Sequence, residues 1–144
     1  MALVGTANPN HLIAAFSIDG TSGALAPLAS SPFTTGIQPL LLALDPTGKF
    51  LYSSNIHDNT ISAFTIDANS GSLNAVGGSP FSAGTSVGGI TVDTSGKFLY
   101  ATNLLSNAIA GFNIAPSTGA LTPFSGTPSS AGMQPLFLKA VQVK

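Results

Sequence analysis

Residues 48–73 read GKFLYSSNIHDNTISAFTIDANSGSL and residues 96–121 read GKFLYATNLLSNAIAGFNIAPSTGAL, so one block returns after 48 residues. A more divergent copy precedes both, and the three align without insertion or deletion. Because the chain has 144 residues, three such repeats fill it, and an internal repeat of this length indicates one repeated structural unit. The positions that recur in all three copies include Ile13, Ile61 and Ile109; Phe16, Phe64 and Phe112; Ile18, Ile66 and Ile114; Gly23, Gly71 and Gly119; Leu25, Leu73 and Leu121; Pro32, Pro80 and Pro128; Gly36, Gly84 and Gly132.

Each repeat contains four short strand signals separated by turn signals. In the central copy the apolar run 38–44 favours a strand that is buried on both faces, and 45–48 (DPTG) is a tight turn. The second and third strands are expected over 49–54 and 60–66, and a short fourth strand begins at Leu73. No stretch has helical periodicity. Four antiparallel strands per ~40–50 residues indicate an all-β protein built from β-propeller blades.

The chain does not begin or end at a blade boundary. Residues 1–37 align with strands two to four of a blade, 38–85 and 86–134 are whole blades, and 135–144 align with a first strand. Since propellers typically have about four to eight blades, three blades are expected to close a ring only by assembly with other copies of the chain. A dimer of six blades is expected ahead of a trimer of nine. The alternative is an excised piece of a longer propeller.

The two quoted blocks resemble blades of the lactonase-like propellers, the YVTN-like group that includes 6-phosphogluconolactonase-type enzymes. The resemblance extends over the whole chain and is most evident in GKFLY at 48–52 and 96–100. It implies seven blades in a complete member and lactone hydrolysis around the channel, whereas this chain has three repeats.

The composition argues against several classes of partner. Charged side chains make up 6% of the chain and the net charge is −1, so no basic surface is expected for nucleic acid or for anionic lipid. No apolar run approaches the ~18 residues of a membrane span, and no signal peptide is expected at Met1. A soluble protein of unassigned compartment is therefore predicted.

Few residues carry candidate chemistry. His57 and Asp58 form the only adjacent imidazole–carboxylate pair and are the candidate general base and its partner; an exposed polar loop is the alternative. His11 lies on the equivalent loop of the first repeat and is a weak candidate for ligand binding. Two histidines without a third ligand do not predict zinc, so no metal and no cofactor are expected.

Three further residues are weak candidates for contact with a ligand. Lys139 lies where the other repeats have Ala43 and Thr91, and it would bring positive charge to the channel for an anionic ligand; the alternative is a packed stem with its amine in water. Phe33 and Phe81, in the SPF segments, would stack on a carbohydrate or fill gaps between blades. A small molecule or a carbohydrate is thus the expected class of ligand.

Two other pairs are predicted to be structural. Asp45 and Asp93 begin Asp-x-x-Gly-Lys turns that an aspartate caps. Asn55 and Asn103 end second strands and are expected to bond to loop amides.

Together these features favour a non-catalytic, self-assembling propeller that serves as a scaffold or binding module. The chain has no arginine and no glutamate, so no clamp for a phosphorylated substrate is evident. The alternative is a lactonase-type hydrolase that acts at the channel mouth through His57 and Asp58. A truncated or engineered minimal propeller is a third interpretation, since it too fits three complete repeats.

Overall fold

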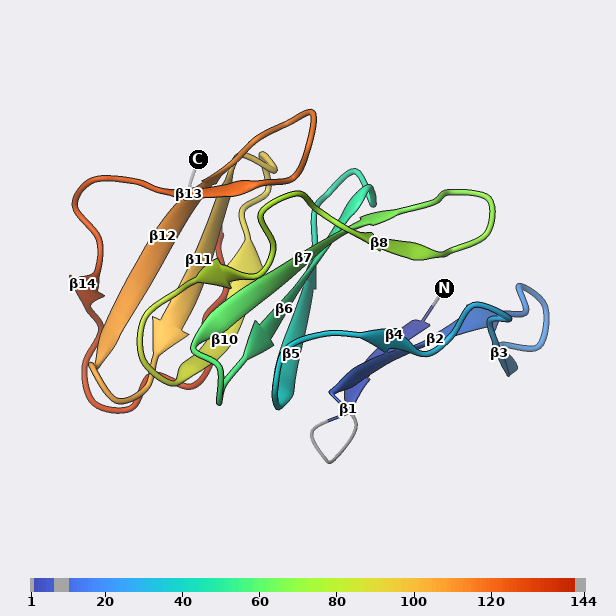
Figure 1. The fold of residues 1–144 in the computed structure, drawn as a ribbon, viewed down its shortest axis with the longest axis horizontal. Coiled ribbons are helices and arrows are strands. Elements are labelled where there is room, and N and C mark those ends of the chain that lie inside the picture. The colour runs from blue at the N-terminus through green and yellow to red at the C-terminus, as the bar shows by residue number, and fades with distance from the viewer. Residues whose placement is uncertain (1, 7–10, 142–144) are drawn as a thin grey trace.

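The computed structural model describes residues 2–6 and 11–141, and these form strands, turns and loops (Figure 1). No helix among them is long and apolar enough to cross a membrane. The strands are β1 (Ala2–Thr6), β2 (Leu12–Ile18), β3 (Leu25–Pro27), β4 (Phe33–Thr34), β5 (Pro39–Leu44), β6 (Phe50–Asn55), β7 (Thr60–Ile66), β8 (Leu73–Ala75), β9 (Phe81–Ser82), β10 (Val87–Val92), β11 (Phe98–Asn103), β12 (Ala108–Ile114), β13 (Leu121–Pro123) and β14 (Ser129–Ser130).

The strands form three antiparallel sheets, one for each predicted blade. Their orders are β1-β2-β3 with β4 on β2, β5-β6-β7-β8 with β9 on β7, and β10-β11-β12-β13 with β14 on β12. The fourth strand of each blade is therefore broken into two short pieces that pair with the same third strand. At the break in the central blade, the Ser79 hydroxyl accepts the backbone N–H of Ala63 at 2.9 Å, and Ser31 does the same for Ala15.

The register of each sheet also repeats after 48 residues. Phe50 lies opposite Thr65 in the central blade, and Phe98 lies opposite Asn113 in the third. The pairing of first and second strands shifts at the same place in both blades, after Pro39 and after Val87. The all-β fold predicted from the repeat is confirmed.

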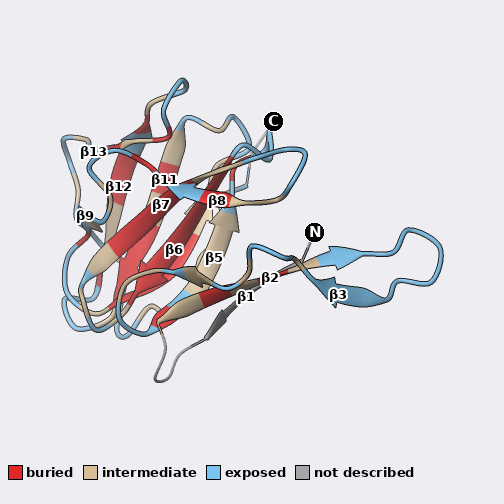
Figure 2. Ribbon diagram, turned by 45° about the vertical axis from the view of Figure 1, so that its right-hand side comes forward, coloured by how far each residue is buried: buried red, intermediate tan, exposed pale blue. Residues whose placement is uncertain are grey.

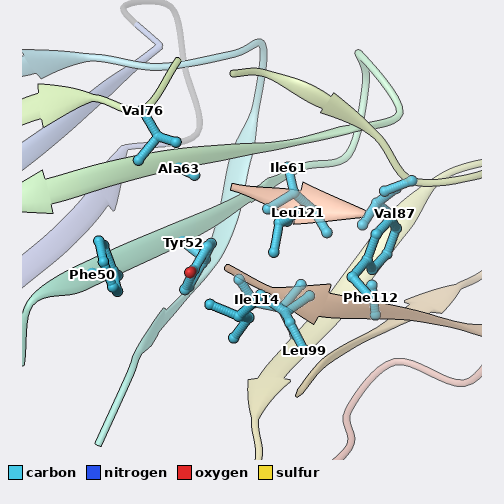
Figure 3. Packing of buried hydrophobic residues seen from close by; sticks show 13 residues of the cluster. Phe50, Tyr52, Ile61, Ala63, Val76, Val87, Leu99, Phe112, Ile114 and Leu121 are labelled. Carbon is cyan, nitrogen blue, oxygen red and sulfur yellow. The ribbon is translucent and has the colours of Figure 1, made fainter. Parts of the chain in front are cut away.

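The hydrophobic core lies between blades and not within one of them. Phe50, Tyr52 and Ile61 of the central blade pack against Leu99 and Phe112 of the third (Figure 3). A smaller cluster joins the first and central blades in the same way; it contains Ile13, Leu51, Phe64 and Leu73. Figure 2 accordingly shows most burial on β6, β7, β11 and β12. Since burying one such side chain is worth about 1.5–3 kcal/mol, each blade depends on its neighbour.

A buried hydrogen bond crosses the interface between the central and third blades. The Tyr52 hydroxyl donates to the carbonyl oxygen of Gly119 at 3.0 Å. Burial, assisted by the charge of Asp45, raises the pKa of Tyr52 well above its ordinary value, so the phenol keeps its proton and remains a donor.

Aspartates cap the turns at both ends of the blades' hairpins, as predicted for Asp45 and Asp93. Asp45 accepts the backbone N–H of Phe50 at 2.7 Å and that of Thr47 at 3.0 Å. Partial burial raises the pKa of Asp45 and of Asp93, but hydrogen bonds to each carboxylate outweigh it and leave both pKa values lowered. The pKa values of Asp19 and Asp67 are lowered chiefly by hydrogen bonds from the backbone of Ser22 and of Ser70.

These four aspartates predict a loss of stability in acid. Because their folded pKa values lie below the ordinary 3.8, the unfolded chain binds more protons than the folded one in this range. The free energy of unfolding should therefore be level above that value and fall as the pH drops through the folded pKa values. Urea unfolding followed by circular dichroism at several pH values checks this. Asp93→Asn should be less stable at pH 7 but lose less on acidification; an unchanged slope would contradict the assignment.

Residues 135–141 lie where the first strand of a next blade would be. β5 and β10, the first strands of the two complete blades, lie side by side. The segment 135–141 lies beside β10 in turn, with Leu136 and Phe137 against the backbone of Gly89. Although the sequence predicts a strand over 135–144, residues 135–141 form no ladder, and 142–144 lie outside the described residues. Pairing of this segment with a second copy stays a prediction.

Candidate functional site

The loops between second and third strands are bound to the entrance of the next blade, at one end of the propeller. In each repeat the last loop residue accepts the backbone N–H of the residue that precedes the next blade's first strand. Both residues of each pair have a left-handed φ, between 47° and 59°. The three pairs are His11 Nδ1 with Gln38 at 3.4 Å, Asn59 Oδ1 with Ser86 at 2.6 Å, and Asn107 Oδ1 with Gln134 at 2.8 Å.

This repeated contact gives His11 a structural role. Its imidazole stands where the other repeats have the amides of Asn59 and Asn107. Since Nδ1 accepts a hydrogen bond, the proton of the neutral ring lies on Nε2. Alignment of positions 11, 59 and 107 would have revealed this role from the sequence. Residues 7–10, the rest of the predicted loop, lie outside the described residues.

Asp58 is bound to the same entrance and is not paired with His57. Its carboxylate accepts the backbone N–H of Ile37 at 2.5 Å. Asp58 and His11, from adjacent blades, thus bind the consecutive amides of Ile37 and Gln38. The structure brings these two side chains together, although the sequence suggested the pair His57 and Asp58.

His57 remains as the unengaged imidazole at this end. It is exposed, and within residues 2–6 and 11–141 it has no hydrogen bond and no ion pair. No group of three His, Asp or Glu side chains in that part of the chain could hold a metal ion. This end of the blades therefore presents one exposed imidazole beside a hydrogen-bonded backbone frame.

Asn55 anchors the second strand beneath this loop. It is fully buried, and its Nδ2 donates to Thr60 Oγ1 at 3.1 Å and to Ser62 Oγ at 2.9 Å. Its Oδ1 accepts from Thr35 Oγ1 at 3.2 Å. The bonds to side-chain hydroxyls replace the loop amides that the sequence suggested. They fix the start of the loop that carries His57.

Asn103, the equivalent residue of the third blade, has lost these partners. The hydroxyl residues around Asn55 are replaced by Ala83, Ala108 and Ala110. Asn103 is 2% exposed, its Oδ1 has no hydrogen-bond partner, and it lines a cavity of about 170 Å³. Such an unpaired buried amide costs stability.

The other predicted contact residues lie at both ends of the blades. Phe33 and Phe81 pair with Ile13 and Ile61, near the loops between second and third strands, and Lys139 lies near the turn at Asp93. Lys139 is exposed and lines a cavity of about 460 Å³ with Asp93 and Tyr100, between 138–141 and the third blade. Phe33 and Phe81 are half-buried at the start of β4 and β9, and each packs against the cluster between its blade and the next. Their positions match gap filling between blades.

Comparison with known proteins finds one family and several propellers. The family model described as "Lactonase, 7-bladed beta-propeller" matches residues 5–87, more than half of the chain. No curated protein gives a significant match. The chain spans about a third of the length of the solved propeller structures that it resembles.

Three solved structures are similar to this chain, and two of them are candidate 6-phosphogluconolactonases from Bacteroides. The protein from Bacteroides uniformis is 26% identical with a TM-score of 0.73, over 81% of this chain and 34% of that one. The protein from Bacteroides fragilis is 24% identical with a TM-score of 0.73, over 81% and 32%. The periplasmic gluconolactonase of Pseudomonas aeruginosa is 22% identical with a TM-score of 0.71, over 86% and 36%. These likenesses support the propeller fold.

Proposed function

Because the chain belongs to the lactonase family of seven-bladed β-propellers, we propose that its three blades contribute to a propeller that hydrolyses a lactone at the channel mouth. Membership of this family favours hydrolysis over the non-catalytic scaffold that the composition suggested. Low charge does not oppose this function, because a neutral lactone needs no cationic clamp.

The substrate class follows from the side chains available. The chain has no arginine, and its polar residues are mainly hydroxyl and amide side chains. Such groups hydrogen-bond the hydroxyls of a sugar, whereas a phosphorylated lactone would favour an arginine clamp. The substrate we propose is therefore an unphosphorylated sugar lactone.

Hydrolysis requires a base and groups that stabilise an oxyanion. Water attacks the carbonyl carbon, the bond from that carbon to the ring oxygen breaks, and the ring oxygen takes a proton to leave a hydroxy acid. The observation that carries the proposal is the exposed His57 imidazole, unengaged among the described residues while Asp58 and His11 hold the frame. His57 is the base that would take the proton from water, and the exposed side-chain amides of Gln38 and Gln134 would donate hydrogen bonds to the oxyanion.

Replacing His57 tests this assignment. With glucono-1,5-lactone as substrate, His57→Ala is expected to lower kcat/KM by about 100-fold or more, because a general base typically contributes that much. Lactone consumption is measured by titrating the acid released, corrected for spontaneous hydrolysis.

The repeat supplies a matched control. Leu105 occupies the equivalent loop position in the third blade and is 78% exposed, so Leu105→Ala should leave the rate unchanged. An active His57→Ala variant would refute the role of His57. A wild-type protein that is folded by circular dichroism but has no activity on neutral lactones would refute the proposed function itself.

A further inference from the structure

A small cavity lies in the third blade, at the break in its fourth strand between β13 and β14. Its volume is about 170 Å³, close to the ~150 Å³ that accommodates a benzene-sized ligand in an apolar interior. The buried part of its lining includes Ala83, Asn103 and Phe112, and the exposed part includes Ser82, Pro123 and Pro128. A ligand therefore has a route into the cavity from solvent.

In the central blade, side chains of the protein itself occupy the equivalent place. The three hydroxyls bonded to the amide of Asn55 belong to Thr35, Thr60 and Ser62. The equivalent residues in the third blade are Ala83, Ala108 and Ala110. Two of these alanines, Ala83 and Ala110, line the cavity. The cavity thus lies where hydroxyl-bearing side chains would otherwise surround the asparagine.

Asn103 keeps the position of Asn55 without its partners. Each amide lies against a glycine of the preceding blade, because a side chain built at Gly84 would overlap Asn103 and one built at Gly36 would overlap Asn55. Asn103 is 2% exposed and its Oδ1 has no hydrogen-bond partner. The hydroxyls that accept from Nδ2 of Asn55 are missing beside it. The amide is therefore held in place and left unpaired, so a ligand that pairs with it removes a cost in free energy.

A backbone group at the cavity lacks its usual partner as well. In the central blade the Ser79 hydroxyl accepts the N–H of Ala63 at 2.9 Å. The equivalent hydroxyl in the third blade belongs to Thr127, and it donates to the carbonyl oxygen of Phe124 at 3.0 Å. It does not accept the N–H of Gly111, and both residues line the cavity. A hydroxyl oxygen in the cavity would replace this acceptor.

The lining also decides the class of ligand. Because alanine, proline and phenylalanine side chains make up most of it, a ligand with many polar groups would lose hydrogen bonds to water without replacement. A single hydroxyl suits the amide, since the hydroxyls around Asn55 both donate to its Oδ1 and accept from its Nδ2. We propose that this cavity binds a small molecule with one hydroxyl on an apolar body, of about the size of phenol, and that the hydroxyl pairs with Asn103. The site is separate from His57 and independent of the proposed lactone chemistry.

Titration with phenol, followed by NMR of the amide groups, tests the proposal. Phenol should shift the side-chain amide signals of Asn103, which are identified by their loss in Asn103→Ala. In that variant phenol should bind about fivefold more weakly relative to toluene, which has the same size but no hydroxyl, because one hydrogen bond is lost. Ala110→Ser should weaken phenol binding about tenfold or more, because the new hydroxyl binds the amide and takes up space in the cavity.

The first blade supplies a matched control for the serine variant. Ala14 is the equivalent of Ala110, so Ala14→Ser should leave phenol binding unchanged. Circular dichroism checks that each variant is folded. Absence of a saturable shift at Asn103 in the wild type would overturn the proposal. Equal losses for phenol and toluene in Asn103→Ala would overturn the role of the amide, and unchanged phenol binding in Ala110→Ser would overturn the location.

Discussion

Replacing Gly119 by alanine is expected to lower the free energy of unfolding by about 3 kcal/mol. A side chain there would lie 2.4 Å from Cδ1 of Phe50, and the φ of 75° is unfavourable for any residue with a Cβ. The backbone cannot readily move away, because the Gly119 carbonyl accepts from Tyr52 and its N–H donates to Ala115 at 2.8 Å. Urea unfolding followed by circular dichroism measures the change.

Gly23→Ala measures the cost of placing alanine at a left-handed φ without the contact between blades. Gly23 has nearly the same φ, 73°, but no atom of the described residues lies within 4 Å of a side chain built there. The variant should therefore cost only about 1–2 kcal/mol. Equal losses for the two variants would show that Phe50 yields and that the interface is not tightly packed.

The sequence predicts the blades well because the repeat and the strand patterns agree. The third strand of the central blade was expected over 60–66, and β7 spans Thr60–Ile66. The first strand was expected over 38–44, and β5 spans Pro39–Leu44. The two-residue strand β9 was not predicted. A strand so short has no periodicity of its own and forms only because Phe81 and Ser82 reach the edge of β7.

The candidate site was predicted in its position more than in its contacts. His57 lies on the expected loop, but Asp58 is bound to Ile37, 21 residues earlier. A side chain that accepts from a distant backbone amide leaves no motif, so adjacency in the sequence suggested the wrong partner for Asp58. The role of His11 was recoverable, because the repeat places asparagines at the same position.

Asn55→Ala is expected to lower the free energy of unfolding by about 3 kcal/mol. The variant removes the acceptor of Thr35 and the donor to Thr60 and Ser62, and it leaves their hydroxyls partly buried without partners. The side chain is fully buried, so water does not replace it freely. The measurement is again the urea midpoint by circular dichroism, at equal protein concentration for each variant.

Asn103→Ala is the matched variant and should cost less than about 1 kcal/mol, since its Oδ1 has no partner to lose. In the central blade the Ser62 hydroxyl oxygen accepts a hydrogen bond from Asn55 Nδ2 at 2.9 Å, and Ala110 is the equivalent of Ser62 in the third blade. Ala110→Ser would give Asn103 the same acceptor and should stabilise the chain by about 1 kcal/mol. In the double variant Ala110→Ser with Asn103→Ala this gain should vanish, because the new hydroxyl has no amide to bind. Equal costs for the two asparagine variants would mean that these residues act through packing against Gly36 and Gly84, not through their hydrogen bonds.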